Sequence, residues 1–540
     1  MSLRWFIIVI VTALTSGGYV ASATGAEMVS NEGQTLEINV SMKGSGSSGD
    51  WAPYLLGSNT RGQHAMKGYA GIDGFAYADY DLGRRFSWTA GVEVAAAWQA
   101  SASYKKYLAE EAEWIERNWH PSYATVYQLW GGVKFRGVML WAGMRDRVSS
   151  IVDDRLSSGD VVLSTNARAI PRVEAGFVDF QNIPFTNGWA QINGCISYGK
   201  YTSNGSLEGR YNYWNSHITL GQLFAYKNIY FRSRQDMPLA VTIGVQVGGE
   251  YGGTTYWYSE GKQIRLIKNN ANLRSLWEMF FPTSRYSDGF MEGNHVGSWD
   301  FLGRYRFKNN IELGAYFQWL WEDGSGMAKR NRTDGLWGLS LTMPGSYPAL
   351  KKVIVEYIDF RDQSGPIHWA PSDAPGTTIG TEATGGDNDY NSSGFNAWSN
   401  YGLGLGSSFP KAPLYNSDGN IQFKHNRTHG VQIGAEGFIS SKVEWLFKFS
   451  YGVAWGTGRI PYAVGLKNTS GLVEVSWHAD KLLQGLSVGA TMAFDSGSLR
   501  GDNVGGMLNI KYATSFDVGQ DIRNKKKSKS IRQWKSIRYF

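Results

Sequence analysis

The sequence has 540 residues but only one cysteine, Cys195, and few charged residues: Asp, Glu, Lys and Arg make up 18% of it, against about 25% in typical soluble domains. A single cysteine cannot form an intramolecular disulfide, which excludes a disulfide-stabilised scaffold. Beyond the N-terminus no run of about 18 apolar residues occurs, which excludes a bundle of membrane helices. Disorder is excluded as well, because 42% of the residues are hydrophobic.

Glycine and aromatic residues are abundant instead. The chain has 67 glycines, and Trp, Tyr and Phe together make up 14% of it. This composition, with almost no cysteine and no membrane helix, leaves two classes of protein: secreted all-β proteins and outer-membrane β-barrels.

The N-terminal segment predicts export. Arg4 provides a positive charge, Trp5 to Leu14 is an apolar stretch, and Ala21-Ser22-Ala23 fits a cleavage site. Ten apolar residues are too few to span a bilayer. Residues 1–23 are therefore interpreted as a signal peptide, and the mature protein is expected in the outer membrane of a Gram-negative cell.

The net charge of +7 comes entirely from the C-terminus. Eight Lys and Arg and one Asp lie in residues 520–540, which gives 8 − 1 = +7. The rest of the chain is neutral, so its basic pI gives no reason to expect a nucleic-acid partner. Residues 517–540 are interpreted as a basic tail that could contact anionic lipid or glycan.

The main signal is strict alternation over about ten residues. In Asn310 to Trp321 and in Lys442 to Trp455, aromatic and aliphatic residues occupy one face, and mostly polar or small residues occupy the other. Nineteen such segments occur along the chain, and one of them is expected to be a broken piece. Residues 24–516 are therefore predicted to form an all-β fold, a transmembrane antiparallel outer-membrane β-barrel of about 18 strands.

Connections between the predicted strands alternate between short and long. Short turns usually face the periplasm, so the long connections, among them 148–169 and 363–397, are expected at the cell surface. Two of the long loops carry helical spacing, one from Leu108 to Trp119 and the other from Leu273 to Phe281, and both are predicted to form short helices. The alternation of lengths fails around 398–441, where 398–406 is predicted as a strand.

No catalytic or metal-binding pattern stands out. His425 and His429 lie in strand-like sequence, which separates them along the strand. The stretch from Asp387 to Asn391 resembles the start of a calcium loop, but Ser392 replaces the glycine that such a loop needs. The chain is therefore not expected to be an enzyme, and no cofactor or metal is predicted.

Charged residues inside the strand pattern are the candidate site. Arg145, Asp146 and Arg147 end one predicted strand, and Asn166 and Arg168 precede the next. Charge facing lipid costs about 2–4 kcal/mol at mid-bilayer, so these side chains are expected in the lumen or at its rim. They can form a network that fills the lumen, or donate hydrogen bonds to sugar hydroxyls and carboxylates. Both interpretations remain open at this stage, with the network slightly favoured.

These segments resemble the Wzi-type capsule assembly proteins of bacterial outer membranes. Residues 158–171, SGDVVLSTNARAIP, are similar to the signature of that family, with Ala169 in place of a proline. Residues 51–62, which contain Asn59 and Arg61, and residues 387–391 resemble the Bacteroidetes-like branch. Asn59 and Arg61 therefore join the candidate polysaccharide-binding or lumen-network residues.

The resemblance implies a closed barrel of about 18 strands that acts as a lectin and attaches or assembles capsular polysaccharide at the cell surface. Its expected partners are capsular or surface polysaccharide, outer-membrane lipid and, during biogenesis, the barrel assembly machinery. The alternative function is a porin-like diffusion channel for small solutes or oligosaccharides, because one face of the strands is polar.

Overall fold

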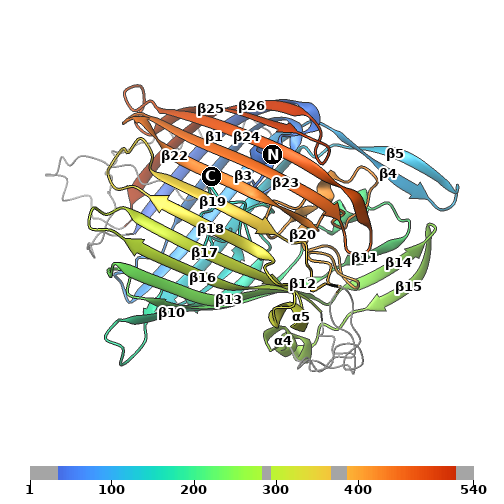
Figure 1. Ribbon diagram of the computed structural model, residues 1–540, viewed down its shortest axis with the longest axis horizontal. Coiled ribbons are helices and arrows are strands. Elements are labelled where there is room, and N and C mark those ends of the chain that lie inside the picture. Colours follow the sequence, from blue (N-terminus) through green and yellow to red (C-terminus); the bar gives the residue numbers. More distant parts are fainter. Residues whose placement is uncertain (1–33, 282–292, 366–385, 519–540) are drawn as a thin grey trace.

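The structure is a computed structural model that describes residues 34–281, 293–365 and 386–518. The predicted signal peptide and nearly all of the basic tail lie outside these residues. Most strands belong to one 19-stranded antiparallel sheet, in which β8 and β9 both pair with β10 and are two pieces of one strand. The wall therefore has 18 strands, and β1 pairs with β26 from Thr35↔Asp517 to Ser47↔Gly505, which closes the barrel (Figure 1). The predicted fold class is confirmed.

The strands of the wall are β1 (Thr35–Trp51), β2 (Met66–Ala78), β3 (Phe86–Gln99), β6 (Tyr123–Phe135), β7 (Val138–Met144), β8 (Arg172–Phe177), β9 (Gln181–Asn182), β10 (Ala190–Lys200), β12 (Leu223–Ser233), β13 (Leu239–Tyr251), β16 (Asn294–Arg306), β17 (Glu312–Trp321), β18 (Gly335–Thr342), β19 (Lys352–Asp359), β22 (Thr428–Ser440), β23 (Val443–Gly456), β24 (Pro461–His478), β25 (Leu486–Ser496) and β26 (Asn503–Asp517).

The remaining elements lie in the connections. They are β4 (Ala102–Leu108), β5 (Glu113–Trp119), β11 (Ser216–Leu220), β14 (Thr254–Ser259), β15 (Lys262–Lys268), β20 (Ser399–Asn400), β21 (Leu403–Gly404), α2 (Tyr54–Gly57), α3 (Asn204–Arg210), α4 (Leu273–Phe280), α5 (Gly324–Met327) and a 3₁₀ turn at Pro413–Tyr415. Among the described residues, no helix is both long enough and apolar enough to cross a bilayer.

The wall has its apolar face outside and its polar face inside. In β3, Trp88 and Val92 are each 40% exposed on the outer face, whereas Thr89 and Glu93 on the inner face are fully buried. The same holds in β23, where Phe447 is exposed on the outside and its neighbour Lys448 is buried. This pattern is the reverse of that in a soluble barrel and fits a wall surrounded by lipid.

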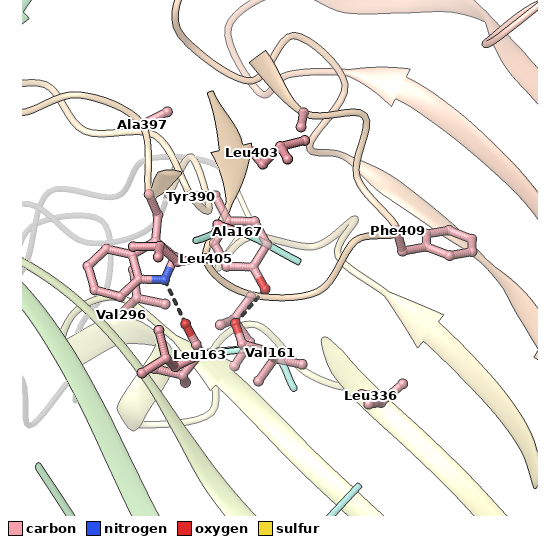
Figure 2. Packing of buried hydrophobic residues seen from close by; sticks show 14 of the residues in the cluster. Val161, Leu163, Ala167, Val296, Leu336, Tyr390, Ala397, Leu403, Leu405 and Phe409 are labelled. Carbon is pink, nitrogen blue, oxygen red and sulfur yellow. Dashed lines mark hydrogen bonds between the residues drawn. The ribbon is translucent and has the colours of Figure 1, made fainter. Parts of the chain in front are cut away.

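Three connections fold into the interior and form what we call the plug: residues 52–65, 145–171 and 386–427. Its centre is an apolar cluster shared with inward-facing wall residues such as Val296 and Leu336. Trp398 donates from Nε1 to the carbonyl of Val162 over 2.8 Å, and Tyr390 donates to the carbonyl of Val161 over 2.6 Å (Figure 2). The expectation that loops 148–169 and 363–397 lie at the cell surface is therefore wrong for their described plug residues.

Three local predictions are also wrong. Residues 398–406 are not a wall strand but the small hairpin β20–β21 within the plug. The predicted helix from Leu108 to Trp119 is the hairpin β4–β5, whose turn holds Ala112 at φ 56°. The single strand expected over 217–233 is divided at Gly221, whose φ of 72° turns the chain from β11, in a separate three-stranded sheet, into β12 of the wall. The helix from Leu273, by contrast, is present as α4.

Candidate functional site

Arg61 joins the plug to the barrel wall. Its guanidinium donates from Nη2 to Oε1 of Glu93 over 2.8 Å, from Nη1 to the other oxygen of Glu93, and from Nη1 to Oδ2 of Asp146 over 3.1 Å. Burial alone would lower the pKa of Arg61, but these two carboxylates outweigh it and raise the pKa above its ordinary value. The backbone N–H of Arg61 also donates to the carbonyl of Thr165, so one residue links two plug segments and β3.

A β-bulge in β6 builds the wall side of this contact. The register between β3 and β6 shifts after Glu93↔Gln128, because Tyr127 is an extra residue in β6. As a result both Tyr127 and Gln128 face the interior. Gln128 donates to Glu93 over 2.6 Å and so joins Arg61 as a donor to this buried carboxylate. The side-chain oxygen of Gln128 accepts from the backbone N–H of Asp146 over 2.9 Å.

Arg168 covers an open edge of the wall. β7 pairs with β6 only as far as Leu129, so the carbonyl of Val126 has no partner from β7. Arg168 donates to that carbonyl over 3.0 Å, and its guanidinium lies 4.6 Å from the ring centres of both Tyr127 and Tyr401. Since Tyr401 belongs to the plug, Arg168 holds plug and wall together by packing as well as by hydrogen bonding.

Arg168→Ala is expected to lower the free energy of unfolding by roughly 1–3 kcal/mol, because it removes a charged hydrogen bond and two cation–π contacts. The measurement is the urea midpoint of the refolded barrel, together with its conductance in a planar bilayer. Arg117→Ala, on the exposed strand β5, is the matched control and should change neither. Unchanged stability and conductance for Arg168→Ala would remove Arg168 from the plug contacts.

Arg145 and Arg147 contact different parts of the wall. Arg145 pairs with Asp79 over 2.7 Å and lies 4.9 Å from the ring centre of Trp130. Arg147 lies 4.2 Å from the ring centre of Tyr226 and 3.7 Å from the carboxylate of Glu174. The two arginines therefore attach the start of the plug segment 145–171 to β6, β8 and β12, and to Asp79 just after β2.

Asn59 and Asn166 connect the plug segments to one another. The backbone N–H of Asn59 donates to Oδ1 of Asn166 over 3.2 Å, and Nδ2 of Asn166 donates to the carbonyl of Gly404 over 3.1 Å. The seven residues chosen from the sequence thus all lie at contacts of the plug. The cavity that four of them line, Arg145, Asp146, Arg147 and Arg168, has room for about one water molecule.

Asp146 makes the plug contact dependent on pH. Burial raises the pKa of its carboxyl from 3.8 to about 6, although Arg61 acts in the opposite direction. The folded protein holds this proton more tightly than the unfolded chain, so the stability that it contributes is complete below pH 3.8 and is lost as the pH rises through about 6. Asp146→Asn should flatten the pH dependence of the urea midpoint between pH 4 and 6 relative to the unsubstituted protein. Parallel pH profiles for the two proteins would contradict this role.

Several interior residues were not singled out from the sequence. Asp160 of the plug accepts from Gln246 over 2.9 Å and from Gln318 over 2.9 Å, and both glutamines also donate to Asp300. Arg155 pairs with Glu436 over 2.9 Å and with Glu444 over 2.6 Å. The wall members of these networks lie on the polar face of strands with alternating sequence. That alternation predicts that they face the interior, but it does not predict which plug residue each one contacts.

A group of aromatic side chains lies at the long-connection end of the barrel, where the hairpins β4–β5 and β14–β15 project beyond the wall (Figure 1). We call Tyr107, Trp114 and Trp214 the apical aromatic cluster. The ring centres of Tyr107 and Trp214 are 4.4 Å apart, and that of Trp114 lies 5.4 Å from both. Trp114 is 45% exposed. The cluster thus offers an aromatic surface to solvent.

Backbone contacts fix the apical aromatic cluster in place. The N–H of Tyr107 donates to the carbonyl of Asn212 over 2.9 Å, and the N–H of Lys105 donates to the carbonyl of Ser417 over 2.9 Å. The ammonium of Lys106 lies 4.8 Å from the ring centre of Tyr213. Segments far apart in the sequence therefore hold the rings in a fixed arrangement.

The histidine and calcium-loop patterns lie within the described residues. Among the described residues, no group of three or more His, Cys, Asp or Glu side chains is placed to hold a metal ion. His425 contacts Tyr462, and Asn391 hydrogen-bonds the backbone of Phe423.

The fold and its apolar outer surface define the class as a closed β-barrel of the outer-membrane type. No family model and no curated protein matches the sequence. Among solved structures, the chain is similar to Wzi of Escherichia coli, described as a carbohydrate-binding β-barrel involved in group 1 capsule assembly. The identity is 12%, the TM-score is 0.51, and the match covers 88% of this chain and 83% of that one.

Channel proteins of the outer membrane also match, at lower TM-scores. OccAB2 of Acinetobacter baumannii is 11% identical with a TM-score of 0.43, and the match covers 89% of this chain and 98% of that one. OprD of Pseudomonas aeruginosa is 10% identical with a TM-score of 0.39, with 93% and 100% covered. At 12% identity the likeness to Wzi shows the barrel fold and assigns no function.

Proposed function

We propose that this protein holds capsular or other surface polysaccharide at the cell surface, through the long-connection end of an outer-membrane barrel. The observation that carries the proposal is the apical aromatic cluster, because exposed, rigid rings can stack on the apolar faces of sugars. Asn215, which follows Trp214 in the chain, and Arg117, on the same hairpin as Trp114, can hydrogen-bond to sugar hydroxyls.

The filled interior supports this function over diffusion through the barrel. The plug contributes Trp398, Tyr390 and Phe423, which are all buried in an apolar cluster with inward-facing residues of β12 and β16 to β19. A barrel closed in this way leaves its projecting hairpins as the surface that meets a polymer. A repeating polysaccharide would engage many barrels at once, so weak binding at each would add up by multivalency.

The proposal also states how the barrel is oriented in the membrane and how the protein is exported. By the rule that short turns face the periplasm, the apical aromatic cluster faces the outside of the cell. Export by a signal peptide over residues 1–23 is part of the same proposal, and it requires no catalytic activity and no cofactor.

The direct test is binding of the refolded barrel to polysaccharide purified from its own host, together with retention of that polysaccharide by a strain that lacks the gene. We expect binding in vitro and loss of surface polysaccharide in the deletion strain. Absence of binding together with an intact polysaccharide layer would overturn the proposal. A steady open pore of porin size in planar bilayers would support the diffusion channel instead.

A further inference from the structure

Helix α4 lies on the outer surface of the barrel wall and not inside it. Side chains of β12 alternate, so that Tyr226 faces the plug and Lys227 faces outward. The ammonium of Lys227 donates to the carbonyls of Met279 over 2.7 Å and Phe280 over 2.5 Å, at the C-terminal end of α4. The helix is visible outside the cylinder in Figure 1.

The inner side of α4 is packed against the wall. Met279 is 2% exposed and packs on Ala225 and Tyr251, and the hydroxyl of the outward-facing Tyr198 donates to the carbonyl of Leu276 over 3.1 Å. Asn272 caps the helix by accepting from the N–H of Ser275 over 3.0 Å. These contacts hold the helix on β10, β12 and β13, close to their long-connection ends.

The outer side of α4 exposes apolar side chains, with the exposed Arg274 beside them. Leu273 is 84% exposed, Trp277 is 61% exposed and Phe281 is 47% exposed. The ring centre of Phe281 lies 4.7 Å from that of Trp277 and 4.4 Å from that of Phe280, so the aromatic residues form one surface. An exposed apolar surface of this kind on a folded protein marks an interaction site.

The lipid-facing belt of the wall continues directly below this surface. Outward residues of the same strands are exposed and apolar, with Ile229 at 39%, Phe231 at 40% and Ile243 at 45%. Lys227 lies only four residues from the start of β12, so α4 lies at the level where hydrocarbon meets headgroups, which is where Trp side chains concentrate in membrane proteins. Lys227 is the one cationic residue on the outer face of β12, and its ammonium is hydrogen-bonded to α4.

We propose that α4 is an interfacial membrane anchor, whose Leu273, Trp277 and Phe281 insert into the outer leaflet of the bilayer beside the barrel. The helix joins the long connections to the membrane surface and so limits the tilt of the projecting hairpins relative to it. This inference is independent of polysaccharide binding, because α4 and the apical aromatic cluster share no residue.

A nitroxide label tests the proposal in the full chain refolded into phosphatidylcholine vesicles. In a Cys195→Ser background, Leu273→Cys is labelled and its accessibility to oxygen and to a water-soluble nickel chelate is measured. Ile243→Cys in the belt and Trp114→Cys in the apical aromatic cluster are the two reference positions. We expect position 273 to resemble position 243, with oxygen accessibility several-fold above that of the nickel chelate. Accessibility equal to that of position 114 would overturn the proposal.

A second variant separates anchoring from folding. Leu273→Asp should lower the urea midpoint in vesicles but leave it unchanged in detergent micelles, which adapt to the charge. Equal midpoints for Leu273→Asp and the unsubstituted barrel in vesicles would also count against the anchor. Trp277→Ala should leave polysaccharide binding unchanged, so a failure of the anchor and a failure of the binding function give different results.

Discussion

Arg61→Ala should turn a closed barrel into one that conducts ions and unfolds more easily. The substitution leaves the Glu93 carboxylate, which is 0% exposed, with Gln128 as its remaining side-chain donor among the hydrogen bonds described above. Removing one partner of a buried ion pair costs about 3–5 kcal/mol, because the other charge stays buried and uncompensated. The plug segment 52–65 should then separate from β3, and conductance in planar bilayers should rise above that of the unsubstituted protein.

Neutralising the partners of Arg61 tests whether the lost stability comes from a buried, unpaired charge or from a general disruption of packing. In the triple variant Arg61→Met, Glu93→Gln and Asp146→Asn, neither carboxylate that Arg61 pairs with remains charged, so much of the lost stability should return. Arg304→Ala, which removes a partly exposed pair with Glu312, is the control and should cost less than about 1 kcal/mol. If Arg61→Ala stays closed and keeps its urea midpoint, Arg61 does not hold the plug.

Trp114→Ala should weaken the binding of a short oligosaccharide about tenfold, which corresponds to about 1.4 kcal/mol. The ring offers its exposed face to a sugar, while Tyr107 and Trp214 hold it in place on the other side. For the intact polymer the loss should be larger, since each weakened contact lowers the avidity of the whole. Titration calorimetry with the oligosaccharide and retention of polysaccharide by cells measure the two effects.

Trp114→Phe should retain part of the binding, because a smaller aromatic ring can still stack. Trp277→Ala is the matched control, since this tryptophan is also exposed but belongs to α4. Equal binding by Trp114→Ala and Trp277→Ala would show that the apical aromatic cluster does not contact sugar.

The alternation of apolar and polar residues predicted the wall strands, because each side chain of such a strand faces either lipid or the barrel interior. In β23 the residues Phe447 and Lys448 follow the period of two as expected, since one faces hydrocarbon and the other faces the interior. The polar interior position of Glu93 could be predicted in the same way. Its partner Arg61 could not, because no periodicity links a connection to the strand that it meets.

The plug could not be predicted because its burial depends on the rest of the barrel. Residues 398–406 follow a pattern that resembles a strand, yet all of them except the partly buried Tyr401 are buried within the plug. Such a segment has no solvent face and therefore no reliable period. The cost of placing charge in lipid predicted that Asn166 and Arg168, within the family-like stretch 158–171, lie in the lumen or at its rim, but it could not tell which residues they contact.

The hairpin β4–β5 was wrongly predicted as a helix for the opposite reason, because it is exposed rather than buried. Its residues are mostly exposed on both faces, so its sequence has no apolar face with period two, and a helical spacing arose instead from Leu108, Ile115 and Trp119. The backbone bonds of β4 to residues 212 and 417 decide the structure locally, and such tertiary contacts override propensity. The apical aromatic cluster therefore became visible only once distant segments were placed together.

The large sequence separation of the residues that contact one another in the plug has a consequence for biogenesis. Trp398 bonds to a residue 236 positions earlier, and the N–H of Tyr54 donates to Asp495, 441 positions later. Contacts of such separation carry a large loop-closure entropy and slow the folding reaction. A nascent chain whose C-terminal half is still missing lacks the Trp398 that bonds to Val162 and the Asp495 that accepts from Tyr54. Insertion into the membrane and filling of the lumen are therefore expected to occur as one late, cooperative step, after the last strands have arrived.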